Sequence, residues 1–303
     1  SAVICSSFSA EYFSQLPARS FDVKLLRIKI PSNYDPLTRT YHGVWDGTFS
    51  TESVGPFSTG PGTPGVDMAD GSARKIGKYW TNNPAWCYYD LVTNPRYGLG
   101  KYIDEQGLDK WSLYEIGQYC DTLVYDGLGK GGLEPRFTCN TVIQSREDAF
   151  KVVQDMTSVF RGLSYYAAGQ IYAIQDAPKN PIYQFTNANV KDGVFSYSST
   201  SRKIRNNIAI VRYNDKTNFY KPAIEYIEDV DGIRKNGIRE TEVTAFGCTS
   251  RGQALRLGRW MLATENLETE TVSFTAGLEG SYVRPGDVIS ISDSYRANLT
   301  RNG

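Results

Sequence analysis

The stretch SREDAFKVVQDMTSVFRGLSYYAAGQIYAIQ, residues 145–175, places a helix directly before a β-hairpin and so decides the fold class. A candidate capping box at 145–148 precedes apolar residues at intervals of three and four, which predicts a helix over 146–160. Two alternating runs, 163–167 and 170–175, flank an Ala-Gly pair, the pattern of a hairpin. The chain is therefore predicted to have an α+β fold.

Two more helices are predicted upstream of this stretch. Pro84–Thr93 and Lys110–Val124 both carry apolar residues at helical spacing, and Asp109 is placed to cap the second helix. Between them, Asn94-Pro-Arg-Tyr-Gly98 reads as a turn, because its proline disfavours helix at the preceding residue and Gly98 allows a positive φ. The two helices are expected to form a compact hairpin.

The beginning of the chain is predicted to hold two neighbouring strands and a long loop. Phe21–Ile30 mixes apolar and basic residues in near alternation, and Tyr41–Phe49 alternates again around an Asp-Gly pair. Residues 50–72 are dominated by Gly, Pro, Ser and Thr and are too poor in apolar side chains to form a core. We expect an exposed loop there, either a mobile insertion or an arm that contacts a neighbouring subunit.

The last part of the chain is predicted to be mostly β. One helix, Arg251–Glu265, interrupts it and is capped by Thr249 or Ser250. Regular spacing of short strands indicates a barrel or a sandwich. The strands are expected at Arg136–Thr141, Asn187–Tyr197, Asn207–Tyr213, Pro222–Glu228, Arg239–Ala245, Thr271–Ala276 and Asp287–Ser292.

Three domains follow from these patterns. Residues 1–80 form an N-terminal β segment with the long Gly/Pro-rich loop, and residues 81–180 form the helical hairpin with an α/β subdomain. Residues 181–303 form a β-barrel domain with one helix. Because single cores stop growing near ~250 residues, more than one unit is expected in a chain of 303 residues.

Composition limits the classes of function. Thirty-three basic residues balance 33 acidic ones, so we expect no sequence-specific nucleic acid as a partner. Aromatic residues make up 13%, including 21 Tyr, which suits protein interfaces. No apolar run approaches the ~20 residues of a membrane span. Five scattered cysteines without CxxC spacing indicate reduced thiols in a protein made in a cytosol.

No catalytic, cofactor-binding or metal-binding residue is predicted. His42 is the single histidine, so no multi-histidine site is available, and a partly exposed strand residue is favoured over a Cys-His or Ser-His dyad. The acidic run 225–231 lacks the spacing of a calcium loop and fits a solvated turn better than a glycosidase pair. The glycines of 127–132 lack the Gly-Lys-Ser/Thr ending of a phosphate-binding loop.

Uncommon strings occur in one order along residues 8–293. They are Ile30–Pro36 with Gly43–Phe49, Ala85–Cys87 with Asn94–Gly98, Trp111–Cys120 with Glu134–Arg136, and Ala245–Ala254 with Pro285–Ile289. In this order they resemble the central hub region of the lambda-type phage tail tip attachment protein J, or host specificity protein J. The chief departure is the stretch 50–72, which is longer than expected for the family. A first residue other than Met and a polar last stretch indicate a piece of a longer chain.

The resemblance implies a structural protein of a phage or prophage tail tip, not an enzyme, with no cofactor. Proteins of this family look like baseplate hub proteins, in which tail-tube-like antiparallel β-barrels with packed helices form a trimeric ring. The implied partners are further copies of the chain, other tail tip and tail tube proteins, and the tape measure protein, with DNA passing through the ring. A host receptor would be bound by regions outside this chain, which would be assembled in the bacterial host cytoplasm and reside in the virion tail.

Tyr41, Trp45, Tyr282 and Arg284 are predicted as interface residues of the homotrimer. An interface made of strand edges and Tyr-rich surfaces would account for the aromatic excess without an active site. Two other functions remain open. A tail-associated cell-wall hydrolase requires two carboxylates converging in one cleft. A receptor-binding module requires exposed Trp and Tyr clustered in a groove.

Overall fold

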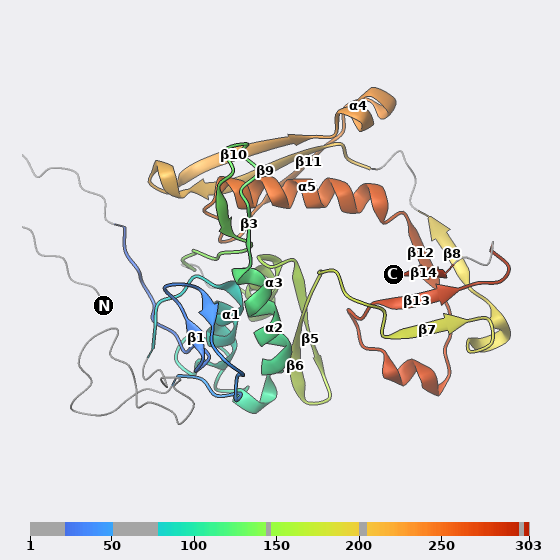
Figure 1. Cartoon of the computed structure of the whole chain (residues 1–303), viewed down its shortest axis with the longest axis horizontal. Coiled ribbons are helices and arrows are strands. Elements are labelled where there is room, and N and C mark those ends of the chain that lie inside the picture. Colours follow the sequence, from blue (N-terminus) through green and yellow to red (C-terminus); the bar gives the residue numbers. More distant parts are fainter. Residues whose placement is uncertain (1–21, 51–77, 144–146, 200–204, 297–299, 303) are drawn as a thin grey trace, which may run out of the picture.

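Three hydrophobic cores organise the chain in the computed structural model. Figure 1 shows the arrangement of its helices and strands. The helical unit joins residues 28–49 to 85–173, the sheet unit lies within 209–262, and the C-terminal unit joins 183–197 to 272–291. The chain therefore enters the C-terminal unit, leaves it for the sheet unit and returns. The structure describes residues 22–50, 78–143, 147–199, 205–296 and 300–302.

The helical unit packs helices against a β-hairpin. Its helix predictions are confirmed in existence and type, and the predicted hairpin is β5–β6, in which Tyr165 lies opposite Tyr172. The elements are β1 (Tyr34–Asp35), β2 (Thr40–Tyr41), α1 (Pro84–Thr93), the 3-10 helix η1 (Glu105–Gly107), α2 (Lys110–Asp121), β3 (Leu123–Tyr125), β4 (Leu133–Pro135), α3 (Ala149–Ser158), β5 (Gly162–Ala167) and β6 (Gln170–Gln175).

Side-chain caps decide where these helices begin. The Asn83 side chain accepts a hydrogen bond from the Ala85 amide at 2.9 Å at the start of α1. Asp109 caps α2 as predicted. Asp148 caps α3, so this helix begins at Ala149 and not at residue 146, and the predicted cap Ser145 lies outside the described residues.

The turn after α1 needs glycine for a different reason than predicted. The φ of Gly98 is not positive, so the left-handed region is not what selects glycine here. A Cβ at this position would lie 1.9 Å from the carbonyl oxygen of Leu91. Close approach of the backbone to the end of α1 therefore excludes any side chain.

The two strands predicted near the N-terminus are wrong for most of their length. The described part of Phe21–Ile30 forms one isolated bridge, between Ile28 and Tyr79. Within Tyr41–Phe49 pairing is limited to the end of β2 and a bridge from Phe49 to Pro31. Alternation fits a strand only where a partner edge is available, and residues 22–27 pair with none of the described strands. Residues 51–72 of the predicted loop lie outside the described part.

The sheet unit is a three-stranded sheet covered on one side by a long helix (Figure 1). The strand order is β10–β9–β11, and β11 runs parallel to β9 because α4 carries the chain across between β10 and β11. The solvated turn expected within 225–231 is wrong, because Glu225 belongs to β10 and Asp231 to α4, which Asp229 caps. The elements are β9 (Ile208–Asp215), η4 (Lys216–Asn218), β10 (Lys221–Glu228), α4 (Val230–Asn236), β11 (Glu240–Thr244) and α5 (Arg251–Leu267), with Ser250 as the cap of α5.

The C-terminal unit consists of two small sheets. β13 lies between β14 and β7, and β12 pairs with β8. A tight turn precedes β13: Gly286 has φ +88° and the Arg284 amide donates to Asp287 Oδ2 at 2.7 Å. The elements are β7 (Tyr183–Thr186), η2 (Lys191–Gly193), β8 (Ser196–Ser199), β12 (Glu270–Ser273), η5 (Leu278–Tyr282), β13 (Ile289–Ser292) and β14 (Thr300–Asn302).

The described residues of one chain form no closed barrel. Each sheet has two or three strands, too few to close, and β11–β9 and β13–β7 are parallel pairs, which corrects the expectation of antiparallel barrels. The strand predicted at Arg136–Thr141 is also wrong. That segment bonds to loops, since the Cys139 amide donates to Asn82 O at 2.8 Å. Most of Asn187–Tyr197 forms η2 and turns.

The packed cores run across the predicted boundary at residue 80. Ile28, Ile30 and Tyr34 share one core with Trp86. The division into 1–80, 81–180 and 181–303 stays a prediction about separately folding parts. Among the described residues no helix is long and apolar enough to cross a membrane.

The four described cysteines, Cys87, Cys120, Cys139 and Cys248, are free thiols in the interior. Burial raises the pKa of Cys87 to about 12 and that of Cys248 to about 11. Because the thiolate is the reactive form, we expect iodoacetamide to leave all four unmodified in the native protein and to alkylate them in concentrated urea. Peptide mass spectrometry measures this, and alkylation of any of the four in the native protein would contradict it.

Candidate functional site

Aromatic side chains fill the core between the N-terminal loops and α2. The rings of Trp45 and Tyr114 stack with centroids 4.5 Å apart, and those of Phe49 and Tyr89 stack at 3.9 Å. Trp86 lies edge-on to Phe49 at 6.1 Å. The strings Gly43–Phe49, Ala85–Cys87 and Trp111–Cys120 therefore meet in one core, although they are far apart in the sequence.

A buried ionic network lies beside these rings. Asp121 accepts hydrogen bonds from Tyr41 Oη at 2.9 Å and from Asn83 Nδ2 at 2.7 Å, and an Arg39 guanidinium nitrogen lies 2.5 Å from its other oxygen. Burial raises the pKa of Asp121, and the positive charge of Arg39 opposes this shift. The carboxylate contacts Tyr41, Asn83 and Arg39, so the network ties the β1–β2 loop to α1 and α2.

The joint between the helical and sheet units is made by residues 133–140 and 245–256. Glu134 on β4 accepts hydrogen bonds from Ser250 Oγ, the cap of α5, and from the guanidinium of Arg256. The same guanidinium donates to Arg136 O at 2.9 Å. The Arg256 and Glu134 side chains are only 16% and 22% exposed, so this ion pair is largely shielded from water.

A second group of bonds extends the joint toward the core. Gln253 Oε1 accepts from the amide and from the hydroxyl of Thr138, both at 3.0 Å, and Gln253 Nε2 donates to Thr138 O at 3.1 Å. Asn140 Nδ2 donates to Thr249 Oγ1 at 2.9 Å. The first turns of α5 are thereby fixed to the extended segment after β4.

Gly252 permits the close approach of α5 in this joint. A Cβ there would lie 2.4 Å from Glu134 Oε1 and 2.7 Å from the backbone oxygen of Asp126. Alanine is a better helix former than glycine, by about 1 kcal/mol in a helix interior, and Gly252 is the second residue of α5. We expect Gly252→Ala to lower the melting temperature instead, since a backbone atom cannot move aside cheaply. A raised melting temperature would show that α5 leaves room for a methyl group beside Glu134 and Asp126.

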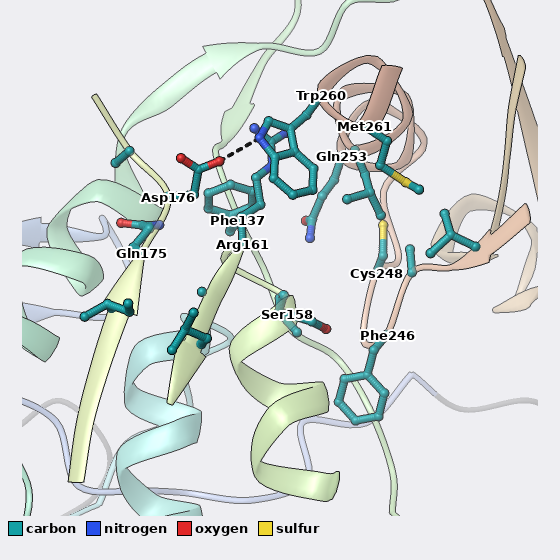
Figure 2. Close-up of a pocket in the computed structure, with 18 of the residues that line it drawn as sticks. Phe137, Ser158, Arg161, Gln175, Asp176, Phe246, Cys248, Gln253, Trp260 and Met261 are labelled. Carbon is teal, nitrogen blue, oxygen red and sulfur yellow. Dashed lines mark hydrogen bonds between the residues drawn. The ribbon is translucent and has the colours of Figure 1, made fainter. Parts of the chain in front are cut away.

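A cavity of about 520 Å³ lies where the three units meet (Figure 2). Its walls come from the end of α3 and the β5–β6 hairpin, from β11 and α5, and from the turn before β13. Its volume falls in the range of about 300–1,000 Å³ typical of small-molecule sites. The lining is largely apolar and includes Phe137, Leu163, Val243, Phe246, Leu257 and Met261.

Two polar contacts cross this cavity. The Arg161 guanidinium lies over the rings of Phe137 and Trp260, 5.3 and 5.0 Å from their centroids, and burial lowers the pKa of Arg161 to about 10. Trp260 Nε1 donates to Asp176 Oδ2 at 2.8 Å, drawn as the dashed line in Figure 2. Both contacts link α5 to the β5–β6 hairpin and so position the helix.

The four predicted interface residues do not gather at one place. Tyr41 and Trp45 belong to the aromatic core of the helical unit, where Trp45 is 4% exposed. Tyr282 is 71% exposed and stacks on Tyr183 with centroids 6.1 Å apart, and Arg284 lies 5.4 Å from the Tyr172 ring. A role of these residues in a trimer interface stays a prediction.

The side chains considered for chemistry have structural contacts. His42 is exposed and its Nε2 lies 3.3 Å from Thr40 Oγ1. Glu225 pairs with Arg251 at 2.8 Å, and Asp229 caps α4. In the part of the chain that the structure describes, no three His, Cys, Asp or Glu side chains are arranged to hold a metal ion.

Comparison with known proteins identifies the family. A model of a putative phage tail protein family matches residues 148–301, half of the chain. The match includes all of the sheet unit with α5. The chain belongs to this phage tail protein family. It is a component of a phage tail, which implies the virion tail as its location.

Two curated relatives match almost all of this tail protein. Tip attachment protein J of Escherichia phage SECphi27 is 42% identical over 297 residues, 97% of this chain and 22% of that protein. Tip attachment protein J of Escherichia phage SECphi4 is 35% identical over 294 residues, 97% of this chain and 23% of that protein. The chain is thus a homologue of tip attachment proteins J and spans about a fifth of their length.

Solved structures of tail proteins are similar at a lower level. The tail protein from Neisseria meningitidis MC58 has a TM-score of 0.37 and 11% identity, covering 64% of this chain and 55% of that one. The 43 kDa tail protein of prophage MuSo2 from Shewanella oneidensis has a TM-score of 0.34 and 14% identity, covering 53% and 48%. Likeness at this level carries no argument about this chain.

Sequence reasoning assigns no role to Glu134 or Gln253, which form the joint. The signal that could have found them is their place in the strings Glu134–Arg136 and Ala245–Ala254. Those strings lie more than a hundred residues apart in the sequence, and the structure brings them together.

Proposed function

We propose that this tail protein forms part of a trimeric hub at the tail tip, which continues the tail tube, supports host attachment and lets DNA pass. The observation that carries the proposal is the 42% identity to tip attachment protein J along 97% of the chain. The proposed partners are further copies of the chain, other tail tip and tail tube proteins, and the tape measure protein. Receptor binding is assigned to regions outside this chain.

Features of the surface support an assembly role. β10 and β11 are the edge strands of the sheet unit, and Ile224 and Tyr226 of β10 are about half exposed. Unpaired edges of this kind are normally protected or paired in an assembly. In the proposed hub, tail-tube-like barrels would be completed by contacts between copies, since a closed threefold ring leaves no edge exposed.

The charge of the chain supports a passive channel. Its formal net charge is zero, so the chain as a whole has no attraction that would retain passing DNA. We further propose that the chain has no catalytic role and is assembled in the cytoplasm of the bacterial host. The carboxylates considered for hydrolysis support this, because Glu225 and Asp229 are engaged in an ion pair and a helix cap.

Immunogold electron microscopy of virions tests the position in the particle. Antibodies raised against the 303-residue chain are expected to label the distal end of the tail, and antibodies against the tube protein to label its length. Label confined to the head or spread along the tube would overturn the assignment to the tail tip.

A further inference from the structure

We infer that residues 22–27, the arm, add a strand to the free edge of β11 in a second copy of this chain. The inference rests on the proposed self-assembly and names one contact that would build it. It starts from a disagreement between sequence and structure. Phe21–Ile30 has the composition of a strand, yet residues 22–27 pair with no strand in the described part of the chain.

The arm exposes apolar side chains that a paired strand would cover. Val23, Leu25 and Leu26 are 45%, 58% and 59% exposed. The arm is held at its two ends, by the Ile28–Tyr79 bridge and by a hydrogen bond from Tyr220 Oη to the Asp22 carboxylate at 3.0 Å. Between these two points, Lys24 Nζ lies over the Trp80 ring, 4.7 Å from the ring centroid. The backbone of the arm is therefore available for a ladder.

The edge of β11 offers the matching backbone groups. The β9–β11 ladder bonds through Arg239 at one end and Ala245 at the other. Because bonding alternates along a parallel strand, the amides and carbonyls of Glu240, Glu242 and Thr244 point away from β9. No described strand pairs with that side of β11.

Charge selects a basic strand for this edge and disfavours other partners. Glu240 and Glu242 are exposed on β11, and Glu242 already pairs with Arg212 on β9. Two β11 edges from different copies would place these carboxylates together, whereas the arm brings the positive charge of Lys24. Cross-strand pairs of opposite charge stabilise by roughly 0.2–1 kcal/mol each, and like charges directly opposite destabilise. The other edge, β10, carries Pro222, which cannot donate to a ladder.

The side-chain faces of the arm and of β11 are also complementary. Alternation places Val23 and Leu25 on one face of the arm and Lys24 on the other. On β11 it places Val243 on the face toward α5 and Glu240 and Glu242 on the exposed face. One register therefore sets apolar residues of the arm beside Val243, which lines the apolar cavity, and sets Lys24 beside the carboxylates.

The test is zero-length carbodiimide cross-linking of an equal mixture of ¹⁴N- and ¹⁵N-labelled chains, read by mass spectrometry. Peptides that join Lys24 of one label to Glu240 or Glu242 of the other label are expected. Cross-links confined to one label would show that the arm folds onto its own β11, and absence of a Lys24 cross-link to β11 would show that it does not bind there. Either result overturns the inference.

Two matched variants separate pairing from general surface effects. Leu25→Asp places a charge against Val243 and is expected to lower the yield of mixed-label product about tenfold, while Lys24 remains available. Leu37→Asp changes another exposed leucine, 86% exposed in the β1–β2 loop, and is expected to leave the yield unchanged. An equal effect of both variants would overturn the inference.

The mass of the complex separates this inference from the hub proposal. A threefold mass without Lys24 cross-links would leave the hub in place and reject the arm contact. Mixed-label cross-links in a species that is only a dimer would support the arm contact and reject the trimeric hub.

Discussion

Replacing Asp121 with alanine is expected to lower the free energy of unfolding by about 3–5 kcal/mol, because Arg39 would be left as a buried charge without its partner. Tyr41 and Asn83 would also lose their acceptor. Urea unfolding followed by tryptophan fluorescence measures this change directly, since Trp86 lies beside the network.

The control for this prediction is an ion pair of the same type at the surface. Asp231 and Arg234 are 80% and 76% exposed and lie 3.7 Å apart in α4. Asp231→Ala is expected to change the unfolding midpoint little, because exposed pairs are screened by water. Equal effects of the two substitutions would contradict the role given to burial.

Replacing Glu134 with alanine is expected to loosen the joint and to lower the free energy of unfolding by about 2 kcal/mol. The reason is that Arg256 and Ser250 both lose a charged acceptor, and hydrogen bonds to charged groups contribute about 1.5–3 kcal/mol. Limited proteolysis should then cut the linking segments near residues 126–132 and 176–182 faster than in the parent chain.

The control for the joint is an ion pair between β10 and the same helix. Glu225 pairs with Arg251, whose side chain is 59% exposed, at the N-terminal end of α5. Glu225→Ala removes the β10 partner of Arg251 and none of the hydrogen bonds made by Glu134 or Gln253, so its proteolysis rate should stay close to that of the parent chain. Faster cutting of the Glu225 variant would show that the loss of any ion pair to α5 loosens the units.

The sequence predicts the helices well because their signals are local. Asp109 lies directly before α2 and Ser250 before α5, and both cap as expected. Strands are predicted less accurately, because an alternating pattern does not show whether a partner strand is available. Phe21–Ile30 alternates, but among the described residues it pairs only through the Ile28–Tyr79 bridge, whereas Asn207–Tyr213 has both β10 and β11 beside it.

The joint could not be predicted from local pattern for a similar reason. Thr138 and Gln253 are 115 residues apart in sequence, and no periodicity connects them. Trp45 shows a second limit of composition, since an aromatic residue that suits an interface is equally suited to a core. Its stacking on Tyr114 depends on how α2 meets the loop before it, which composition does not specify.

The central claim is that this chain self-assembles as part of a tail tip hub. Light scattering over a concentration series, applied to the 303-residue chain and to a version extended at both ends along its gene, tests it most directly. The account predicts a mass three times that of one chain, which is 33.9 kDa for the 303-residue form, in at least one of the two. A monomeric mass for both at every concentration would contradict it.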